Sequence, residues 1–311
     1  MSLPAPLTGV VPPLCTPLTP AGEVDTSSLA ALAERLIDAG VSALFALGSS
    51  GEAAYLNDRS RVTALKAVIE AAGGRVPVLA GAIDMTTARV LDHARTAAEL
   101  GADAVVATAP FYTRTHPLEI ADHFRRLRDG VDVPLFAYDI PVSVHSKLTP
   151  SILLPLAADA TLAGIKDSSG DDGALRRMLV EVRRRGLNDF TVLTGSELSV
   201  DGALLAGAHG VVPGLANVDP AGFVRLYEHA RAGRWEQAAA EQDRLAALFA
   251  ITDAGDPALM GGSSAGLGGF KAALRLLGVI ECADTAAPQV PLGEAAVKTV
   301  RQLLEEGGLL P

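Results

Sequence analysis

Short apolar runs alternate with longer stretches in which hydrophobic residues recur every three or four positions, between residues 10 and 213. The short runs predict β-strands and the longer stretches predict amphipathic helices. This alternation is typical of parallel strands joined by crossover helices. The predicted strands are Val10–Leu14, Ala43–Leu47, Val76–Ala80, Ala104–Thr108, Pro134–Tyr138, Leu162–Lys166, Phe190–Leu193 and Gly210–Pro213.

A predicted helix lies between each strand and the next. These helices are Ser28–Ala39, Asp58–Ala72, Thr86–Leu100, Pro117–Arg128, Pro150–Ala157, Asp172–Arg185 and Ser199–Leu205. A set of eight strands with intervening helices favours a closed (β/α)8 TIM barrel. The pattern leaves an open, doubly wound sheet as the alternative.

The alternation stops after Pro220, and only helical patterns follow. We therefore predict a barrel catalytic domain over residues 1–222 and a C-terminal helical extension over residues 223–311. A glycine-rich stretch, Gly255–Gly269, is expected to connect two of the later helices. The predicted helices of the extension are Phe223–Arg231, Trp235–Ile251, Phe270–Leu277 and Glu294–Leu304.

The composition limits the classes of partner. Hydrophobic residues make up 49% of the chain and aromatic residues only 4%, so Ala, Val, Leu and Ile must build the core. The formal net charge of −10 disfavours nucleic acid and anionic membranes as partners. With no secretory leader and no apolar run of about 20 residues, we expect a cytoplasmic protein.

Cysteine and histidine spacing gives no sign of a metal site. Cys15 and Cys282 lie far apart, and the six histidines lack ligand spacing, so we predict no bound metal. A single disulfide between the two cysteines is left open by the sequence.

The candidate chemistry lies where the predicted strands end, because barrel enzymes carry their active sites at that face. Lys166 follows the apolar run Leu-Ala-Gly-Ile. A lysine removed from water there favours the neutral amine, which can attack a ketone and form an imine. The alternative is a lysine just beyond the strand that points into solvent.

Two further features accompany Lys166. Tyr138 ends the preceding strand, and its phenol could relay protons to and from an imine; the alternative is a core tyrosine.

Ser49 and Ser50 lie in a glycine-flanked turn, Gly48 to Gly51, that is expected to open the following helix. The amides of such a turn bind small anions such as carboxylates, although plain helix capping by serine is the simpler interpretation.

Together these strand ends resemble the dihydrodipicolinate synthase / N-acetylneuraminate lyase family of class I aldolases. The resemblance extends from Gly9 to the helical C-terminal part. It rests on Gly-Ser-Ser-Gly-Glu at 48–52, on Tyr138-Asp-Ile-Pro, on Gly164-Ile-Lys-Asp, and on the 28-residue step from Tyr138 to Lys166.

The resemblance implies a role for each matching residue. Lys166 matches the Schiff-base lysine and Tyr138 the proton-relay tyrosine. Ser49 matches the hydroxyl residue that links this tyrosine to a second one, Tyr112, which family members insert into a neighbouring subunit. The substrate-binding positions are Ser50 and Gly51 in the turn, and Val212, whose carbonyl faces the substrate.

The implied chemistry needs no metal or organic cofactor. The turn holds the carboxylate of pyruvate, the ketone condenses with Lys166, and the resulting enamine adds to an aldehyde or is released by retro-aldol cleavage. The resemblance also implies a homotetramer, assembled as a dimer of dimers.

One position departs from the family pattern. True dihydrodipicolinate synthases carry an arginine shortly after the relay tyrosine, and Ser143 stands there in this chain. Serine cannot pair with a carboxylate in a bidentate manner. We therefore expect a 2-keto-3-deoxy sugar-acid type substrate, with Ser143 and His145 contacting its distal part. The synthase reaction with aspartate semialdehyde, a dehydratase and a non-catalytic keto-acid sensor stay open as alternatives.

Overall fold

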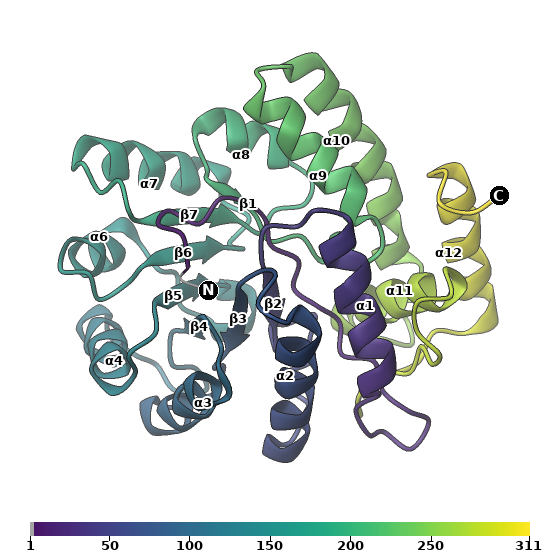
Figure 1. Ribbon diagram of the computed structural model, residues 1–311, viewed down its shortest axis with the longest axis horizontal. Helices are drawn as coiled ribbons and strands as arrows, with labels where there is room; N and C mark the ends of the chain where they lie inside the picture. The colour runs from purple at the N-terminus through teal and green to yellow at the C-terminus, as the bar shows by residue number, and fades with distance from the viewer. Residues whose placement is uncertain (1–2) are drawn as a thin grey trace.

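The computed structural model describes residues 3–311 and forms a barrel of parallel strands surrounded by helices (Figure 1). One eight-stranded sheet has the order β1-β8-β7-β6-β5-β4-β3-β2. Its strands are β1 (Gly9–Val10), β2 (Leu44–Ala46), β3 (Val78–Gly81), β4 (Ala104–Thr108), β5 (Leu135–Asp139), β6 (Gly164–Asp167), β7 (Thr191–Thr194) and β8 (Gly210–Val211).

The sheet closes through the residues that follow β1. Pro13 forms a parallel bridge with Phe45 in β2. The N–H of Leu14 donates to the carbonyl of Phe45 at 2.9 Å, and the N–H of Phe45 donates to Pro12 at 3.0 Å. These bonds pair the two ends of the sheet, so the predicted (β/α)8 barrel is confirmed and the open sheet is wrong.

Helices cover the outside of the barrel between successive strands (Figure 1). The helix between β2 and β3 and the strand β4 have the predicted bounds, and the other predicted elements of the barrel are shifted by a few residues. The helices are α1 (Thr26–Asp38), α2 (Asp58–Ala72), α3 (Thr87–Leu100), α4 (Pro117–Gly130), α5 (Pro141–Val144), α6 (Pro150–Ala158), α7 (Asp172–Arg184) and α8 (Val200–Ala206). The single turn α5 was not predicted.

The barrel interior is a compact apolar cluster contributed by alternate residues of the strands. Its buried members are Leu7, Val11, Ala43, Phe45, Leu79, Ala104, Val106, Phe136, Tyr138, Leu193 and Val212. A second and larger cluster, composed mainly of Ala, Val, Leu and Ile, fills the space between the strands and the helices. The aromatic-poor core expected from the composition is therefore confirmed.

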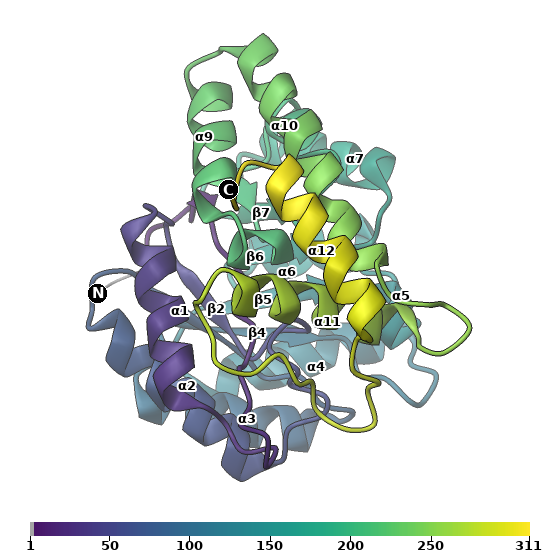
Figure 2. The same cartoon turned by 90° about the vertical axis from the view of Figure 1, so that its right-hand side faces the viewer.

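The C-terminal part consists of helices packed beside the barrel (Figure 2). They are α9 (Pro220–Arg231), α10 (Trp235–Phe249), the 3-10 turn η2 (Ala250–Asp253), α11 (Gly262–Leu276) and α12 (Glu294–Glu306); the 3-10 turn η1 (Gly214–Asn217) precedes them. The helix α9 packs against β1, α8 and α10. The predicted division after residue 222 falls inside α9 and stays a prediction; residues 1 and 2 lie outside the described residues.

The glycine-rich stretch is not the connecting loop that we expected. The helix α11 begins at Gly262, eight residues before the predicted start at Phe270. Its glycines permit close packing: a Cβ on Gly269 would lie 2.2 Å from the carbonyl oxygen of Ile251, and one on Gly268 would lie 2.9 Å from Leu292. Tertiary contact therefore outweighs the low helix propensity of glycine here.

No helix among residues 3–311 has the length and apolar character needed to cross a membrane.

A fully buried ion pair joins the barrel to the C-terminal helices. Glu52 follows the β2 turn, Lys271 lies in α11, and neither side chain is exposed to solvent. Lys271 Nζ also donates to the carbonyl of Asp284 at 2.8 Å, and Glu52 Oε2 accepts the N–H of Ala286 at 2.6 Å. The pair therefore fixes the β2 turn to α11 and to the segment that follows it.

Substitution of Glu52 by Gln should lower the free energy of unfolding by about 3–5 kcal/mol, because it leaves the Lys271 ammonium buried without its counter-charge. Gln keeps an oxygen that can accept the Ala286 N–H, so the loss of stability measures the effect of removing the negative charge. The measurement is urea unfolding followed by circular dichroism. Glu34→Gln is the matched control. Glu34 pairs with Arg75 at the surface, so the urea midpoint of this variant should be close to that of the unmodified protein. Equal midpoints for both variants would contradict the expectation.

Candidate active site

Lys166 and Tyr138 lie side by side inside the C-terminal end of the barrel. They are paired residues in the parallel ladder between β5 and β6. Lys166 Nζ lies 4.2 Å from the centre of the Tyr138 ring and 5.2 Å from the centre of the Phe45 ring. Only 6% of Lys166 is exposed. The burial expected for Lys166 is confirmed, and the alternative of a lysine that points into solvent is wrong.

The Tyr138 hydroxyl is polarised by two neighbours. It shares a hydrogen bond of 3.2 Å with Ser49 Oγ, and Lys166 Nζ lies over the ring that carries the hydroxyl. Burial raises the pKa of Tyr138, but the charge of Lys166 and hydrogen bonds with Ser49, Lys166 and Ser168 outweigh that effect and leave the pKa below its usual value. A phenol in this state can give up and recover a proton more readily than an ordinary tyrosine.

The turn after β2 is built by glycines and by two strained residues. Leu47 and Glu52 both have a φ of 57°, and a Cβ on Gly48 would lie 2.8 Å from the Phe45 ring. Inside the turn, the N–H of Gly51 donates to Gly48 at 3.1 Å, and Thr16 Oγ1 donates to the Gly51 carbonyl at 2.8 Å. The contacts of Gly51 thus hold the shape of the turn.

The turn does not open the following helix, contrary to our expectation. The helix α2 begins at Asp58, and its capping residue is Asn57, whose side chain accepts the N–H of Ser60 at 2.9 Å. Ser49 and Ser50 therefore do not cap a helix. Both instead line a cavity of about 550 Å³ between the barrel and α11. Their hydroxyl groups are available to a ligand in that cavity.

Val212 also belongs to this centre. It is buried immediately after β8, in the same apolar cluster as Tyr138 and Phe45. Its N–H donates to the carbonyl of Thr194 at 2.8 Å, which holds the end of β8 against β7. The structure thus gathers Lys166, Tyr138, Ser49 and Val212 at one end of the barrel.

The other predicted residues lie at the surface. Tyr112 follows β4 with a φ of 72°, and 88% of it is exposed. Ser143 lies in α5, and His145 follows this helix with a φ of 59°; both are exposed. Within one chain, the structure does not bring these three residues into contact with the Lys166 side chain, and their roles stay predictions.

Sequence reasoning missed Glu197. It lies three residues after the end of β7 at Thr194 and lines the same cavity as Ser49 and Ser50. Its Oε2 accepts the N–H of Leu215 at 2.7 Å. Burial raises the pKa of Glu197 to about 7, although hydrogen bonds from Leu215 and Gly214 and the charge of Lys166 act in the opposite direction. An acidic residue directly after a strand end was the signal that could have found it.

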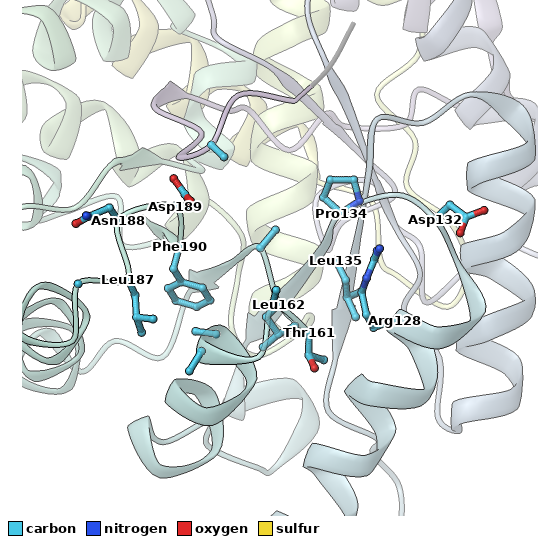
Figure 3. A pocket seen from close by; sticks show the side chains of 16 residues that line it. Arg128, Asp132, Pro134, Leu135, Thr161, Leu162, Leu187, Asn188, Asp189 and Phe190 are labelled. Carbon is cyan, nitrogen blue, oxygen red and sulfur yellow. The ribbon is translucent and has the colours of Figure 1, made fainter.

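A second cavity, of about 480 Å³, lies at the opposite end of the barrel, where β5, β6 and β7 begin (Figure 3). Arg128, Leu135, Thr161 and Phe190 are among its lining residues. That face of a barrel supports stability, whereas chemistry is found at the strand ends. The cavity beside Ser49, Ser50 and Glu197 is therefore the candidate site.

Comparisons with known proteins agree with this geometry. The model of the "Dihydrodipicolinate synthetase family" matches residues 6–307. An uncharacterised DapA-like lyase of Halobacterium salinarum is 36% identical over 86% of this chain and 86% of its own length. The 4-hydroxy-tetrahydrodipicolinate synthase of Phenylobacterium zucineum is 32% identical over 97% of this chain and 98% of its own.

The fold agrees as well. The crystal structure of YagE from E. coli K12, a prophage protein of the dihydrodipicolinic acid synthase family in complex with pyruvate, superposes with a TM-score of 0.90 and 29% identity. It covers 97% of this chain and 99% of that one. With the family model matching nearly its whole length, this chain belongs to the dihydrodipicolinate synthase family of lyases and synthases.

Proposed function

We propose that this protein is a class I aldolase or lyase that forms a Schiff base between Lys166 and pyruvate or a related 2-keto acid. The observation that carries the proposal is the buried Lys166 amine, 4.2 Å from the centre of the Tyr138 ring. A sensor that only binds a keto acid would not need an imine-forming amine beside a proton-relay phenol.

The proposed reaction begins when the neutral Lys166 amine attacks the ketone carbon. Tyr138 donates a proton to the carbinolamine hydroxyl, which leaves as water and gives the protonated imine. Loss of a proton from C3 then gives an enamine, with the imine nitrogen as the electron sink. The enamine attacks an aldehyde carbon to form a C–C bond, or the same steps run backwards in cleavage. Hydrolysis of the imine frees Lys166.

The keto acid's carboxylate is proposed to bind at the turn after β2. Ser50 offers its hydroxyl and N–H, Gly51 shapes the turn around them, and Ser49 connects the turn to the Tyr138 hydroxyl. The pyruvate in the YagE complex supports pyruvate as the keto acid of this family member. We propose that no metal or organic cofactor takes part, because the imine itself accepts the electron pair.

The cavity beside this turn favours an uncharged, hydroxylated second substrate. Its lining includes the carboxylates of Glu197 and Asp253 and the hydroxyls of Thr252 and Ser263, and among the lining residues described there is no Lys or Arg. Such a surface accepts hydrogen bonds from sugar hydroxyls and repels a second carboxylate. Together with Ser143, this supports a 2-keto-3-deoxy sugar acid as the substrate of cleavage.

Two alternatives share the imine. Relatives named 4-hydroxy-tetrahydrodipicolinate synthase support condensation of pyruvate with aspartate semialdehyde. A dehydratase would lose water from a keto-deoxy sugar acid without C–C cleavage. The three reactions differ in product: pyruvate release, pyruvate consumption, or water loss without free pyruvate.

We also propose a homotetramer built as a dimer of dimers. The exposed Tyr112 side chain is the feature that supports it, because an aromatic residue 88% exposed beside a strand end is suited to enter a neighbouring subunit's site. A cytoplasmic location is proposed as well.

Borohydride reduction in the presence of pyruvate should attach reduced pyruvate to Lys166. Intact-protein and peptide mass spectrometry would locate the adduct. Lys166→Met should give no adduct. The control is Lys66→Met, which changes an exposed lysine of α2 and should give as much adduct as the unmodified protein. Pyruvate binding without any adduct would support the sensor alternative instead.

Replacing Ser143 and His145 together by Ala should raise the KM for the second substrate and leave the KM for pyruvate unchanged. The reason is that α5 is proposed to contact only the distal part of the substrate. Steady-state kinetics with each substrate varied in turn would measure this. Unchanged constants for both substrates would remove these residues from the site.

Glu197 should give the reaction a pH dependence near pH 7. Below its pKa of about 7 the side chain is neutral, and above it the carboxylate accepts hydroxyl hydrogen bonds more strongly. We therefore expect kcat/KM for a hydroxylated aldehyde to increase by about ten-fold as the pH rises through 7. This factor corresponds to the free energy of one charge-assisted hydrogen bond.

Glu197→Gln is the control, because it keeps the shape and cannot ionise. Its pH profile should lose the rise near pH 7 and keep every other step of the unmodified protein's profile. A rise that persists in Glu197→Gln would assign it to another group.

A further inference from the structure

Two carboxylates follow the catalytic pair directly along the strands. Asp139 comes after Tyr138 at the end of β5, and Asp167 comes after Lys166 at the end of β6. The two aspartates are paired residues in the ladder, as Tyr138 and Lys166 are. Because side chains alternate along a strand, the aspartates point away from the barrel interior that holds the catalytic pair.

Both carboxylates are buried, which makes their proximity unfavourable without a cation. Asp139 is fully buried, and only 7% of Asp167 is exposed. Burial raises the pKa of Asp139, and the charge of Asp167 adds to that rise, while Leu148 and Lys147 act against it. The two strand ends therefore carry like charges that would repel each other.

Lys147 bridges the two carboxylates. Its ammonium forms an ion pair with Asp139, and its Nζ lies 3.6 Å from Asp167 Oδ2. Backbone donors complete the arrangement: the N–H of Leu148 donates to Asp139 Oδ1 at 3.0 Å, and the N–H of Ser169 donates to Asp167 Oδ1 at 2.9 Å. One side chain thus neutralises part of the charge on both strand ends.

The position of Lys147 in the chain gives this bridge a second effect. Lys147 follows α5, so its ion pair with Asp139 closes a loop that begins and ends at the rim of the barrel. That loop carries Ser143 and His145. The bridge therefore joins three parts of the candidate site: the strand of Tyr138, the strand of Lys166, and the segment proposed to contact the second substrate.

We propose that Lys147 is a positioning residue, which bridges Asp139 and Asp167 so that the Tyr138 hydroxyl and the Lys166 amine keep the separation needed for imine and enamine formation. The inference rests on the proposed imine chemistry of Lys166. Lys147 does not touch the reacting atoms, and it acts through the strand ends. Displacement of a catalytic group by about 1 Å can slow a reaction by about 100-fold, so a bridge of this kind has kinetic consequences.

The test uses pyruvate alone, so it does not depend on the identity of the second substrate. In D2O, the imine loses a C3 proton, the enamine takes up a deuteron, and hydrolysis returns deuterated pyruvate. NMR follows this exchange. In Lys147→Met we expect the maximal exchange rate to fall by at least about ten-fold. The pyruvate concentration at half-maximal rate should change much less, because the carboxylate is proposed to bind at the β2 turn, whereas the ion pairs of Lys147 are with Asp139 and Asp167.

Matched variants separate positioning from stability. Lys147→Arg keeps the cation and should recover most of the exchange rate, whereas Lys66→Met should match the unmodified protein. Thermal unfolding of each variant shows whether it is folded at the assay temperature. If Lys147→Met does not fold, Asp139→Asn combined with Lys147→Met takes its place, because it removes the fully buried carboxylate of the two that would lose their cation and so removes their mutual repulsion. That variant should fold and still exchange slowly.

The outcomes are distinct. Normal exchange in folded Lys147→Met, or in the folded double variant, would overturn the role of Lys147 and leave the imine chemistry intact. Failure of Lys147→Arg to recover the rate would also count against a bridging cation. Absence of exchange in the unmodified protein would overturn the proposed imine chemistry itself, and this inference with it.

Discussion

The buried ion pair between Glu52 and Lys271 is the interaction on which the arrangement of the site depends. Glu52 belongs to the turn that is proposed to hold the substrate carboxylate, and Lys271 belongs to α11. Their opposite charges are paired out of contact with water. Separating such a pair leaves a buried charge unmatched, which costs far more than separating a pair at the surface. The turn and the helix are therefore held in one relative position.

This constraint explains why the C-terminal helices form part of the wall of the candidate site. Once α11 is fixed to Glu52, its N-terminal half forms one wall of the cavity whose other wall contains Ser49 and Ser50. The same helix packs so closely on η2 that Gly269 has no room for a Cβ. The cavity-lining residues of η2 and α11, such as Asp253 and Ser263, are thus placed by the packing that the ion pair anchors.

The parts of the structure that the sequence predicted well are those governed by local pattern. The helix Asp58–Ala72 and the strand Ala104–Thr108 have strong periodicity and clear ends, and both have the predicted bounds. The burial of Lys166 followed from the apolar run before it. The short α5 and the early start of α11 were missed, because a single turn has little periodicity and because tertiary packing overrides the propensity of glycine.

The charged contacts around the site were beyond local pattern for a different reason. Glu52 and Lys271 are far apart in the sequence, and only the packing of α11 against the barrel brings them together. Asp139 and Asp167 meet because β5 and β6 are neighbours in the sheet, and the local pattern of either strand does not show this pairing. The expected capping role of Ser49 and Ser50 was wrong because the helix begins later, at the better signal of Asn57. Lys147 offered no signal at all, since a single lysine in a loop has no pattern until its partners are known.

The candidate site has two halves that are built differently. The half around Lys166 and Tyr138 lies on strands, and the distal half is formed by loops and helix ends. Family membership therefore says more about the first half than about the second. Lys166 and Tyr138 lie on neighbouring strands whose register is fixed by backbone hydrogen bonds, so the barrel holds these two side chains in one relative position. The distal half is assembled from the loop after β7, from η2, from the segment between η2 and α11, and from the first half of α11. Loops tolerate substitution more readily than strands. The proposed imine chemistry therefore rests on side chains held by the strands, whereas the proposed choice of aldehyde rests on loop side chains such as Glu197 and Ser143, which must be tested one by one.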